Sequence, residues 1–233
     1  MASMSDRIRN ISQLRRLLAE RFPRQRLGSP CTPPPTGGCK PTGVSGLDAL
    51  LKGGLPPGAI TELVASNPAS GSSLVLLRLI ESVQGSGEWL VLVDGHDSFD
   101  PSPLADAALS CLLWVRCRDA AAAMRAADFL LRDDNMPLVI LDLRLNPANQ
   151  LRRISSSQWY RLQRLTKQRS CALLVITPFA MVGSAQFRLA LQSRFRLADL
   201  ARGADELVSE LKFEQLRSHG VEPGRREMAA ETG

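Results

Sequence analysis

Aromatic residues, histidine and ordered cysteine patterns are scarce in this sequence, and each shortage excludes a kind of site. One tyrosine, three tryptophans and seven phenylalanines occur among 233 residues, so the core must be mainly aliphatic. The two histidines, His96 and His219, lie far apart, and the five cysteines follow no regular spacing. Such a sequence offers no zinc-binding pattern and no disulfide framework, so we expect reduced thiols and no metal site.

Long apolar runs are also missing. No stretch is long enough to span a bilayer, and the opening "MASMSDRIRN" is too polar for a signal peptide. We therefore expect a cytoplasmic protein without membrane contact. The net charge of +6 and the isoelectric point of about 9.5 allow contact with nucleic acid or with an acidic protein.

Four segments are expected along the chain. Residues 1–22 contain "DRIRNISQLRRLLAER", in which apolar residues recur every three or four positions, so this segment is predicted to be a separate amphipathic helix. Residues 23–41 are dense in proline and glycine and are interpreted as a linker without regular structure. Residues 42–217 are the expected core domain, and the polar tail 218–233 is expected to be disordered.

Short apolar runs alternate with helical patterns in the core domain. Runs that are apolar throughout suit strands buried on both faces of a parallel sheet. The alternation predicts an α/β fold with a mostly parallel central sheet flanked by helices. The expected strands are residues 60–65, 89–94, 112–115, 137–142 and 171–177, and the expected helices are residues 45–51, 72–84, 119–132 and 150–169. Two later segments, 194–200 and 206–217, alternate like half-exposed antiparallel strands.

The stretch "SNPASGSSL", Ser66 to Leu74, has the setting of a phosphate-binding loop, since it lies between an expected strand and an expected helix. A P-loop wraps phosphates with backbone N–H groups, reaches them with a lysine and holds Mg²⁺ with a Ser or Thr hydroxyl. Ser70 and Gly71 provide small residues for a tight turn, and either Ser72 or Ser73 can supply the hydroxyl. No lysine occurs between Ser66 and Leu77. A helix N-terminus still favours anions, so weak binding of ATP or ADP stays open.

The residues before this turn carry a longer pattern. "TGVSGLDALLKGGLPPGAITEL", Thr42 to Leu63, resembles the opening of the RecA-like ATPase core. The positions that match are Thr42, Gly43, Leu47, Asp48, Leu51, Gly53, Gly54, Leu55, Pro56, Gly58, Ile60, Glu62 and Leu63. "LVDGHDSFDP" (92–101) and "LVILDL" (138–143) are similar to the second-strand segment and the Walker B strand of that superfamily. The resemblance covers roughly residues 42–200 and implies a RecA-like core.

The departures from the RecA-like pattern fall at its chemistry. The P-loop Lys-Thr pair corresponds to Gly71-Ser72 or Ser72-Ser73, and the glutamate that activates water corresponds to His96. Asp94 or Asp97 takes the role of this base only if the alignment with the RecA-like pattern is shifted. The Asn-Gln sensor pair corresponds to Thr177-Pro178, and the long DNA-binding loop is reduced to "PFAMVGSAQ" (178–186).

Only the Walker B residue, Asp142, remains of the catalytic set. It could hold Mg²⁺ through water, or it could only cap the end of its strand. Losing the phosphate clamp, the base and the sensor together argues against hydrolysis, since each such group contributes several kcal/mol to lowering a barrier. We therefore expect an inactive RecA-type ATPase without a required cofactor.

A degenerate RecA-like core of this size is similar to the ImuA family of SulA-related proteins. That resemblance implies a non-catalytic accessory or scaffold role in SOS-induced mutagenic translesion DNA synthesis and DNA damage tolerance. The implied partners are a Y-family polymerase-like protein and RecA or an error-prone polymerase. Two alternatives stay open. One is a divergent DNA-dependent ATPase or recombinase, in which Lys52 or an arginine of another protomer supplies the positive charge that the turn lacks. The other is a SulA-like cell-division inhibitor.

Basic residues are frequent in the later half of the chain. The candidates for partner or DNA contact are Arg153, Arg161, Arg164, Lys167, Arg194 and Arg196. Several of them recur at helical steps, which allows a basic stripe, although a solvated helix face is the ordinary interpretation. Trp159 and Tyr160 lie in the same segment, and one of them is expected in the core. Self-association through the N-terminal helix is a further hypothesis.

Overall fold

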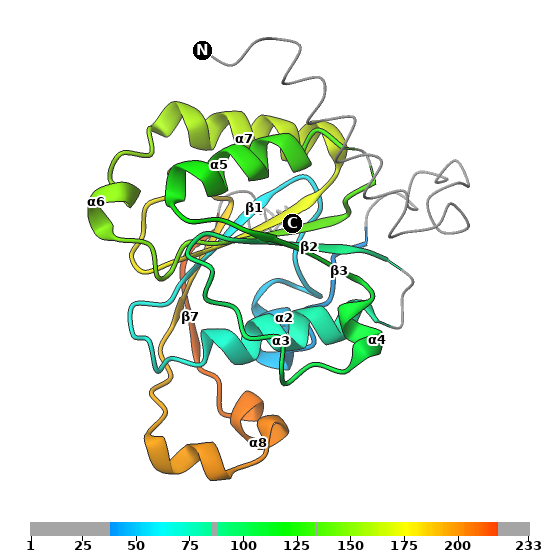
Figure 1. Ribbon diagram of the computed structural model, residues 1–233, viewed down its shortest axis with the longest axis vertical. Helices are drawn as coiled ribbons and strands as arrows, with labels where there is room; N and C mark the ends of the chain where they lie inside the picture. Colours follow the sequence, from blue (N-terminus) through cyan, green and yellow to red (C-terminus); the bar gives the residue numbers. More distant parts are fainter. Residues whose placement is uncertain (1–37, 85–87, 134, 219–233) are drawn as a thin grey trace, which may run out of the picture. The chain divides into compact units, whose positions relative to one another are not determined.

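The computed structural model describes residues 38–84, 88–133 and 135–218 (Figure 1). The predicted N-terminal helix, most of the predicted linker and the tail beyond Ser218 lie outside these residues. The first described segment already belongs to the core domain, because Lys40 forms an antiparallel bridge with Leu55. Among the helices that are described, none combines the length and the apolar character needed to cross a bilayer.

A seven-stranded sheet forms the centre of the domain, with the strand order β3-β2-β4-β5-β1-β6-β7. All neighbouring strands are parallel except β6 and β7, which are antiparallel. The strands are β1 (Ile60–Val64), β2 (Leu90–Asp94), β3 (Leu112–Arg116), β4 (Leu138–Asp142), β5 (Ala172–Thr177), β6 (Phe187–Leu191) and β7 (Phe213–Ser218). Four of the strands are buried along their whole length, as the continuous apolar runs predicted. The expected α/β fold with a mostly parallel sheet is thus confirmed.

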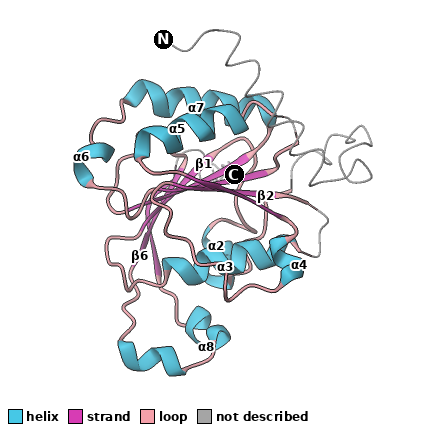
Figure 2. Ribbon diagram, in the orientation of Figure 1, coloured by secondary structure: helices cyan, strands magenta, loops and turns pink. Residues whose placement is uncertain are grey.

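Helices cover both faces of the sheet (Figures 1 and 2). One face carries α2 (Ser45–Leu50), α3 (Ser72–Val83) and α4 (Asp106–Leu109). The other carries α5 (Ala120–Leu130), α6 (Ala148–Leu151) and α7 (Ser156–Arg169). This arrangement explains why the central strands are apolar on both sides, because each face is covered by helices.

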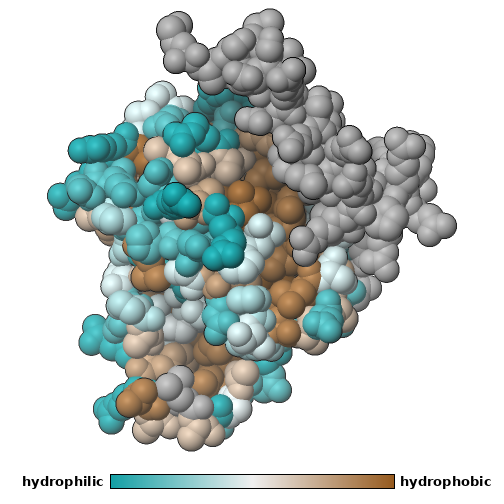
Figure 3. Space-filling view, in the orientation of Figure 1, coloured by the Kyte–Doolittle hydropathy of each residue, from teal (hydrophilic) through white to brown (hydrophobic). Residues whose placement is uncertain are grey.

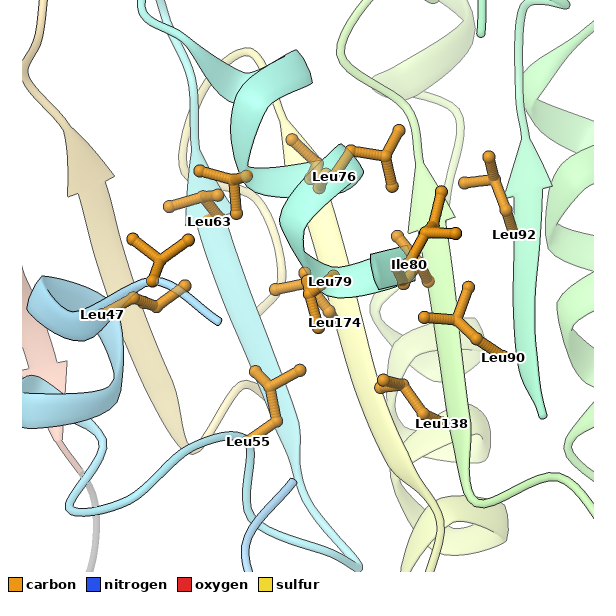
Figure 4. Packing of buried hydrophobic residues seen from close by; sticks show 14 of the residues in the cluster. Leu47, Leu55, Leu63, Leu76, Leu79, Ile80, Leu90, Leu92, Leu138 and Leu174 are labelled. Atoms are coloured by element: carbon orange, nitrogen blue, oxygen red, sulfur yellow. The ribbon is translucent and has the colours of Figure 1, made fainter. Parts of the chain in front are cut away.

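The larger of two apolar clusters lies between α3 and the sheet (Figure 4). Leu76, Leu79 and Ile80 follow the spacing of one helix face and are fully buried. They pack in one cluster with strand residues such as Leu63 and Leu174. Burying a leucine side chain contributes about 1.5–3 kcal/mol, so this face fixes α3 firmly on the sheet.

The predicted helix 150–169 is in fact two helices. α6 ends at Leu151, and α7 begins after Ser155, whose backbone N–H donates to Oε1 of Gln158 at 2.9 Å. This reciprocal arrangement of a serine and a glutamine three residues later is a capping box, which starts a new helix.

The predictions for 194–200 and 206–217 as antiparallel strands were wrong in part. Leu197–Ala201 forms a 3₁₀ helix, because Asp199 accepts the backbone N–H of Arg196 at 2.7 Å and starts a helical turn. The second segment divides into α8 (Ala204–Ser209) and the antiparallel strand β7. The partner of β7 is β6, which the sequence analysis did not identify.

Candidate functional site

The carboxyl ends of four strands meet at one edge of the sheet. Val64 of β1 is the register partner of Thr177 of β5, and Asp94 of β2 is the partner of Asp142 of β4. In open α/β sheets, ligands bind outside the carboxyl ends of the strands. The turn after β1, with the predicted residues Ser70 to Ser73, therefore lies at the edge where a site is expected.

The turn itself is built by local hydrogen bonds. Oδ1 of Asn67 accepts the N–H of Ala69 at 2.9 Å, and the backbone oxygen of Asn67 accepts the N–H of Ser70 at 3.0 Å. Gly71 has a left-handed backbone with φ of +87°, and α3 begins at the next residue. Ser70 is fully buried. The predicted strand, tight turn and helix are confirmed here.

Arg144 is the cation that contacts this turn. Its Nη1 donates to Oγ of Ser72 at 2.7 Å and to Oγ of Ser73 at 3.1 Å. Its Nε lies 3.1 Å from Oδ2 of Asp142, and its backbone N–H donates to Oδ1 of the same carboxylate at 3.1 Å. The structure thus brings the predicted Ser72, Ser73 and Asp142 together through one guanidinium group. Arg144 is not among the site residues predicted from the sequence; its position two residues after the Walker B aspartate was the available signal.

Asp142 lies in an environment that disfavours its charged form. Burial raises the pKa of this carboxyl, and the nearby negative charge of Asp94 adds to the increase, while Arg144 acts in the opposite direction. The side chain is 2% exposed, and that of Arg144 is 11% exposed. The ionised carboxylate therefore depends on its arginine neighbour.

Asp94 organises the loop after β2 through hydrogen bonds to its backbone. Its Oδ2 accepts the backbone N–H groups of Ser98 and Phe99, both at 2.8 Å, and Oδ1 accepts that of His96 at 3.3 Å. Asp97 is exposed and ion-paired with Arg116, whose hydrogen bond lowers the pKa of the Asp97 carboxyl. His96 itself is exposed to solvent. These contacts favour structural roles for both carboxylates.

These residues do not fit the magnesium–nucleotide complex of a P-loop enzyme. No lysine is present in the turn, and the hydroxyl and carboxylate that would hold the metal both contact Arg144. In the part of the chain that the structure describes, no group of three or more His, Cys, Asp or Glu residues could hold a metal ion.

The predicted basic residues on and before α7 lie on the opposite face of the sheet from α3. Arg153, Arg164 and Lys167 are exposed, although Arg153 precedes α7 and does not belong to the helical stripe. Arg161 pairs with Asp128 of α5, at 2.6 Å between Nε and Oδ1. Figure 3 shows hydrophilic residues over α6 and α7. Arg164 and Lys167 are thus exposed cations on α7, whereas Asp128 neutralises the charge of Arg161.

The aromatic pair in α7 divides as expected. Trp159 is 2% exposed and belongs to the second apolar cluster, whereas Tyr160 is 58% exposed. Between α5 and α7 lies a hollow of about 210 Å³, lined by Met124, Arg125, Asp128, Gln158, Arg161 and Leu162.

Arg194 and Arg196 form a separate group. Both are exposed in the segment between β6 and the 3₁₀ helix, near α8 and away from α7 (Figure 1). A hollow of about 640 Å³ lies there, lined by Gln192, Ser193, Arg194, Phe195, Asp199, Arg202, Ser209, Glu210 and Lys212. The six predicted contact residues therefore do not make one surface.

Comparison with known proteins finds partial similarity to RecA proteins. The chain is 30% identical over 104 residues to Protein RecA of Picosynechococcus sp. (strain ATCC 27264 / PCC 7002 / PR-6), and equally to Protein RecA of Gloeothece citriformis (strain PCC 7424). Each match covers 44% of this chain. It is 29% identical over 103 residues to "DNA repair protein recA homolog 1, chloroplastic" of Arabidopsis thaliana, covering 43% of this chain. The matches span 30%, 29% and 23% of the lengths of these relatives. No protein-family model matches the chain. The similarity to RecA proteins, with a sheet consistent with a RecA-like core, supports a RecA-like superfamily for this chain.

Proposed function

We propose that this chain is a non-catalytic RecA-like accessory protein in DNA damage tolerance, with a role in SOS-induced mutagenic translesion synthesis. The observation that supports the loss of catalysis is the contact of Arg144 with Ser72, Ser73 and Asp142. The groups that would bind Mg²⁺ in an active relative are engaged within the chain. The similarity to RecA proteins and to a protein named for DNA repair supports the proposed role in DNA damage tolerance.

The absence of the phosphate-binding lysine is a large loss for phosphoryl transfer. Such reactions depend almost entirely on positioning and on electrostatic stabilisation of the transferred group. Removing one charge-stabilising donor in an enzyme lowers kcat about 10²–10³-fold. With Asp94 holding a loop and His96 at the glutamate position, the described residues near the turn offer no replacement base.

ATP turnover tests this proposal. The purified full chain is assayed with Mg²⁺, with and without single-stranded DNA, beside a RecA control and a mock preparation. We expect turnover no higher than in the mock preparation. Turnover clearly above it, stimulated by DNA, would instead favour the divergent ATPase; the cation at the turn would then be Arg144 and not Lys52 as first considered.

The partners proposed for the scaffold are a Y-family polymerase-like protein and RecA. They follow from the resemblance to the ImuA family, and co-purification with each partner tests them separately. Binding of single-stranded DNA is measured as an additional arm, since basic residues on an exposed helix face can contact phosphates.

The exposed end of α7 is proposed as the contact surface. The double variant Arg164→Glu, Lys167→Glu is expected to weaken binding of the partner or DNA that uses this face about tenfold or more, because it replaces two attractive charges by two repulsive ones. The matched control is Arg118→Glu, Lys52→Glu, which makes the same charge change at exposed positions elsewhere. Equal effects of the two variants would show that only net charge matters and would contradict a specific α7 surface.

A further inference from the structure

We propose that Arg144 takes the place of the divalent cation in this RecA-like core, so that the site works without metal. In P-loop NTPases, Mg²⁺ is held by the P-loop Ser or Thr and by the Walker B Asp. Here the guanidinium lies between the same two kinds of group, 2.7 Å from Oγ of Ser72 and 3.1 Å from Oδ2 of Asp142. The inference rests on the proposed loss of ATPase chemistry and extends it.

The assignment does not depend on how the turn is aligned with a P-loop. The magnesium-binding hydroxyl corresponds to Ser72 in one alignment and to Ser73 in the alignment shifted by one residue. Arg144 donates to both hydroxyls, at 2.7 and 3.1 Å. Either alignment therefore places the guanidinium beside the hydroxyl that would bind the metal.

Electrostatics favour a permanent cation at this position. Asp142 and Asp94 are neighbours in register on adjacent strands, and both are buried. The two carboxylates stay ionised together more easily when a positive charge lies nearby, and the guanidinium of arginine stays protonated at all accessible pH values. Mg²⁺ demands near-octahedral coordination and loses its waters reluctantly, so it competes poorly with a cation that is covalently attached to the site.

The consequence is a constant connection between α3 and β4. In an active relative, the metal and nucleotide join the P-loop to the Walker B strand only when they are bound. In this chain the side chain of Arg144 joins them at all times, so neither Mg²⁺ nor nucleotide is needed to set this edge of the sheet. We expect the stability of the protein to be insensitive to metal and nucleotide.

Thermal unfolding of the full chain tests this inference, with Mn²⁺ as the probe because its binding can also be followed by electron paramagnetic resonance. The natural chain is expected to show the same Tm in millimolar Mn²⁺, in Mn²⁺ with ATP and in EDTA. Arg144→Ala is expected to lower Tm in EDTA by roughly 10 °C, since it leaves a buried carboxylate unpaired. Mn²⁺ is then expected to bind this variant and to restore part of the lost Tm.

Arg152→Ala is the matched control, because Arg152 is an exposed arginine close in sequence. It is expected to change Tm little and to gain no response to Mn²⁺. If Arg144→Ala does not fold, Arg144→Lys keeps the charge and should remain insensitive to Mn²⁺, and a gain of Tm with Mn²⁺ there would overturn the inference.

Two results would overturn the inference: Mn²⁺-dependent stabilisation of the natural chain, or an Arg144→Ala variant that folds and binds no Mn²⁺. Both are independent of turnover. ATP hydrolysis would refute the proposed function, whereas metal binding by a natural chain that does not hydrolyse ATP would refute only the role given to Arg144.

Discussion

Replacing Arg188 with methionine is expected to lower the free energy of unfolding by about 3–5 kcal/mol, because it leaves a buried carboxylate without its counter-ion. That carboxylate is Glu62 of β1, which is fully buried. Nε of Arg188 lies 2.5 Å from Oε2 of Glu62, and the arginine side chain is 18% exposed. Methionine keeps much of the aliphatic length, so the change removes mainly charge and hydrogen bonds.

The Glu62–Arg188 pair holds the loop between β5 and β6. Oε1 of Glu62 accepts the backbone N–H groups of Met181 at 2.7 Å and Val182 at 3.1 Å, together with the hydroxyl of Thr177 at 3.1 Å. Nη2 of Arg188 donates to the backbone oxygen of Val182 at 3.0 Å. The loop between β5 and β6 is thus fixed by the chain's own charges.

Denaturant unfolding of the variants measures the effect, and Arg217→Met is the matched control. Arg217 contacts the same loop through a single hydrogen bond to the backbone oxygen of Gly183, at 3.0 Å, so its loss should cost only about 1 kcal/mol. The double variant Glu62→Gln, Arg188→Met removes both charges and is expected to recover part of the loss. If Arg188→Met costs no more than Arg217→Met, the buried pair does not anchor the loop.

The sequence predicted those features that depend on residues close together in the chain. Apolar runs such as the one in β4 identified the buried strands, because the strands of a parallel sheet covered on both faces are mostly apolar. The helical pattern after the small-residue turn predicted a helix over 72–84, and α3 covers Ser72–Val83 of that range. The small residues of the turn correctly placed the start of that helix at Ser72.

The features that the sequence did not reveal depend on pairs of distant residues. Arg144 reaches Ser72 across 72 positions, and Arg188 reaches Glu62 across 126. Local patterns of charge and hydrophobicity cannot say which arginine meets which carboxylate, because the pairing follows from the order of the strands. The short strand β6 was missed for a similar reason. Its residues form a strand by pairing with β1 and β7, which lie far from it in the sequence or follow it after a long connection.

The internal contacts of Arg144 and Arg188 hold two regions of the domain in place. Arg144 lies between the start of α3 and the end of β4, and Arg188 fixes the loop between β5 and β6. Both places are thus held by the chain's own charges. A chain in which both regions are held in this way is suited to present a constant surface to a partner, which is what the proposed scaffold role requires.

Gly54→Ala is expected to cost about 3–5 kcal/mol, through backbone strain and through loss of the contact that ties the first described residues to the core. Gly54 has φ of +128°, and a Cβ atom there would lie 2.1 Å from the backbone oxygen of Lys40. The backbone oxygen cannot move aside without breaking the bridge in which Lys40 and Leu55 exchange hydrogen bonds of 2.8 and 2.7 Å. The second glycine of the "GGLP" motif is therefore required by close packing.

The neighbouring glycine provides the control that separates strain from packing. Gly53 also has a left-handed backbone, with φ of +114°, but a Cβ there would meet nothing within 4 Å. Gly53→Ala should therefore show the conformational strain alone, about 1–2 kcal/mol. Thermal unfolding of the two variants measures the difference. Equal losses would mean that both glycines are needed only for their backbone conformation. A larger loss for Gly54→Ala would establish that the segment at Lys40 is a packed part of the core, although the sequence alone places Lys40 in the linker 23–41.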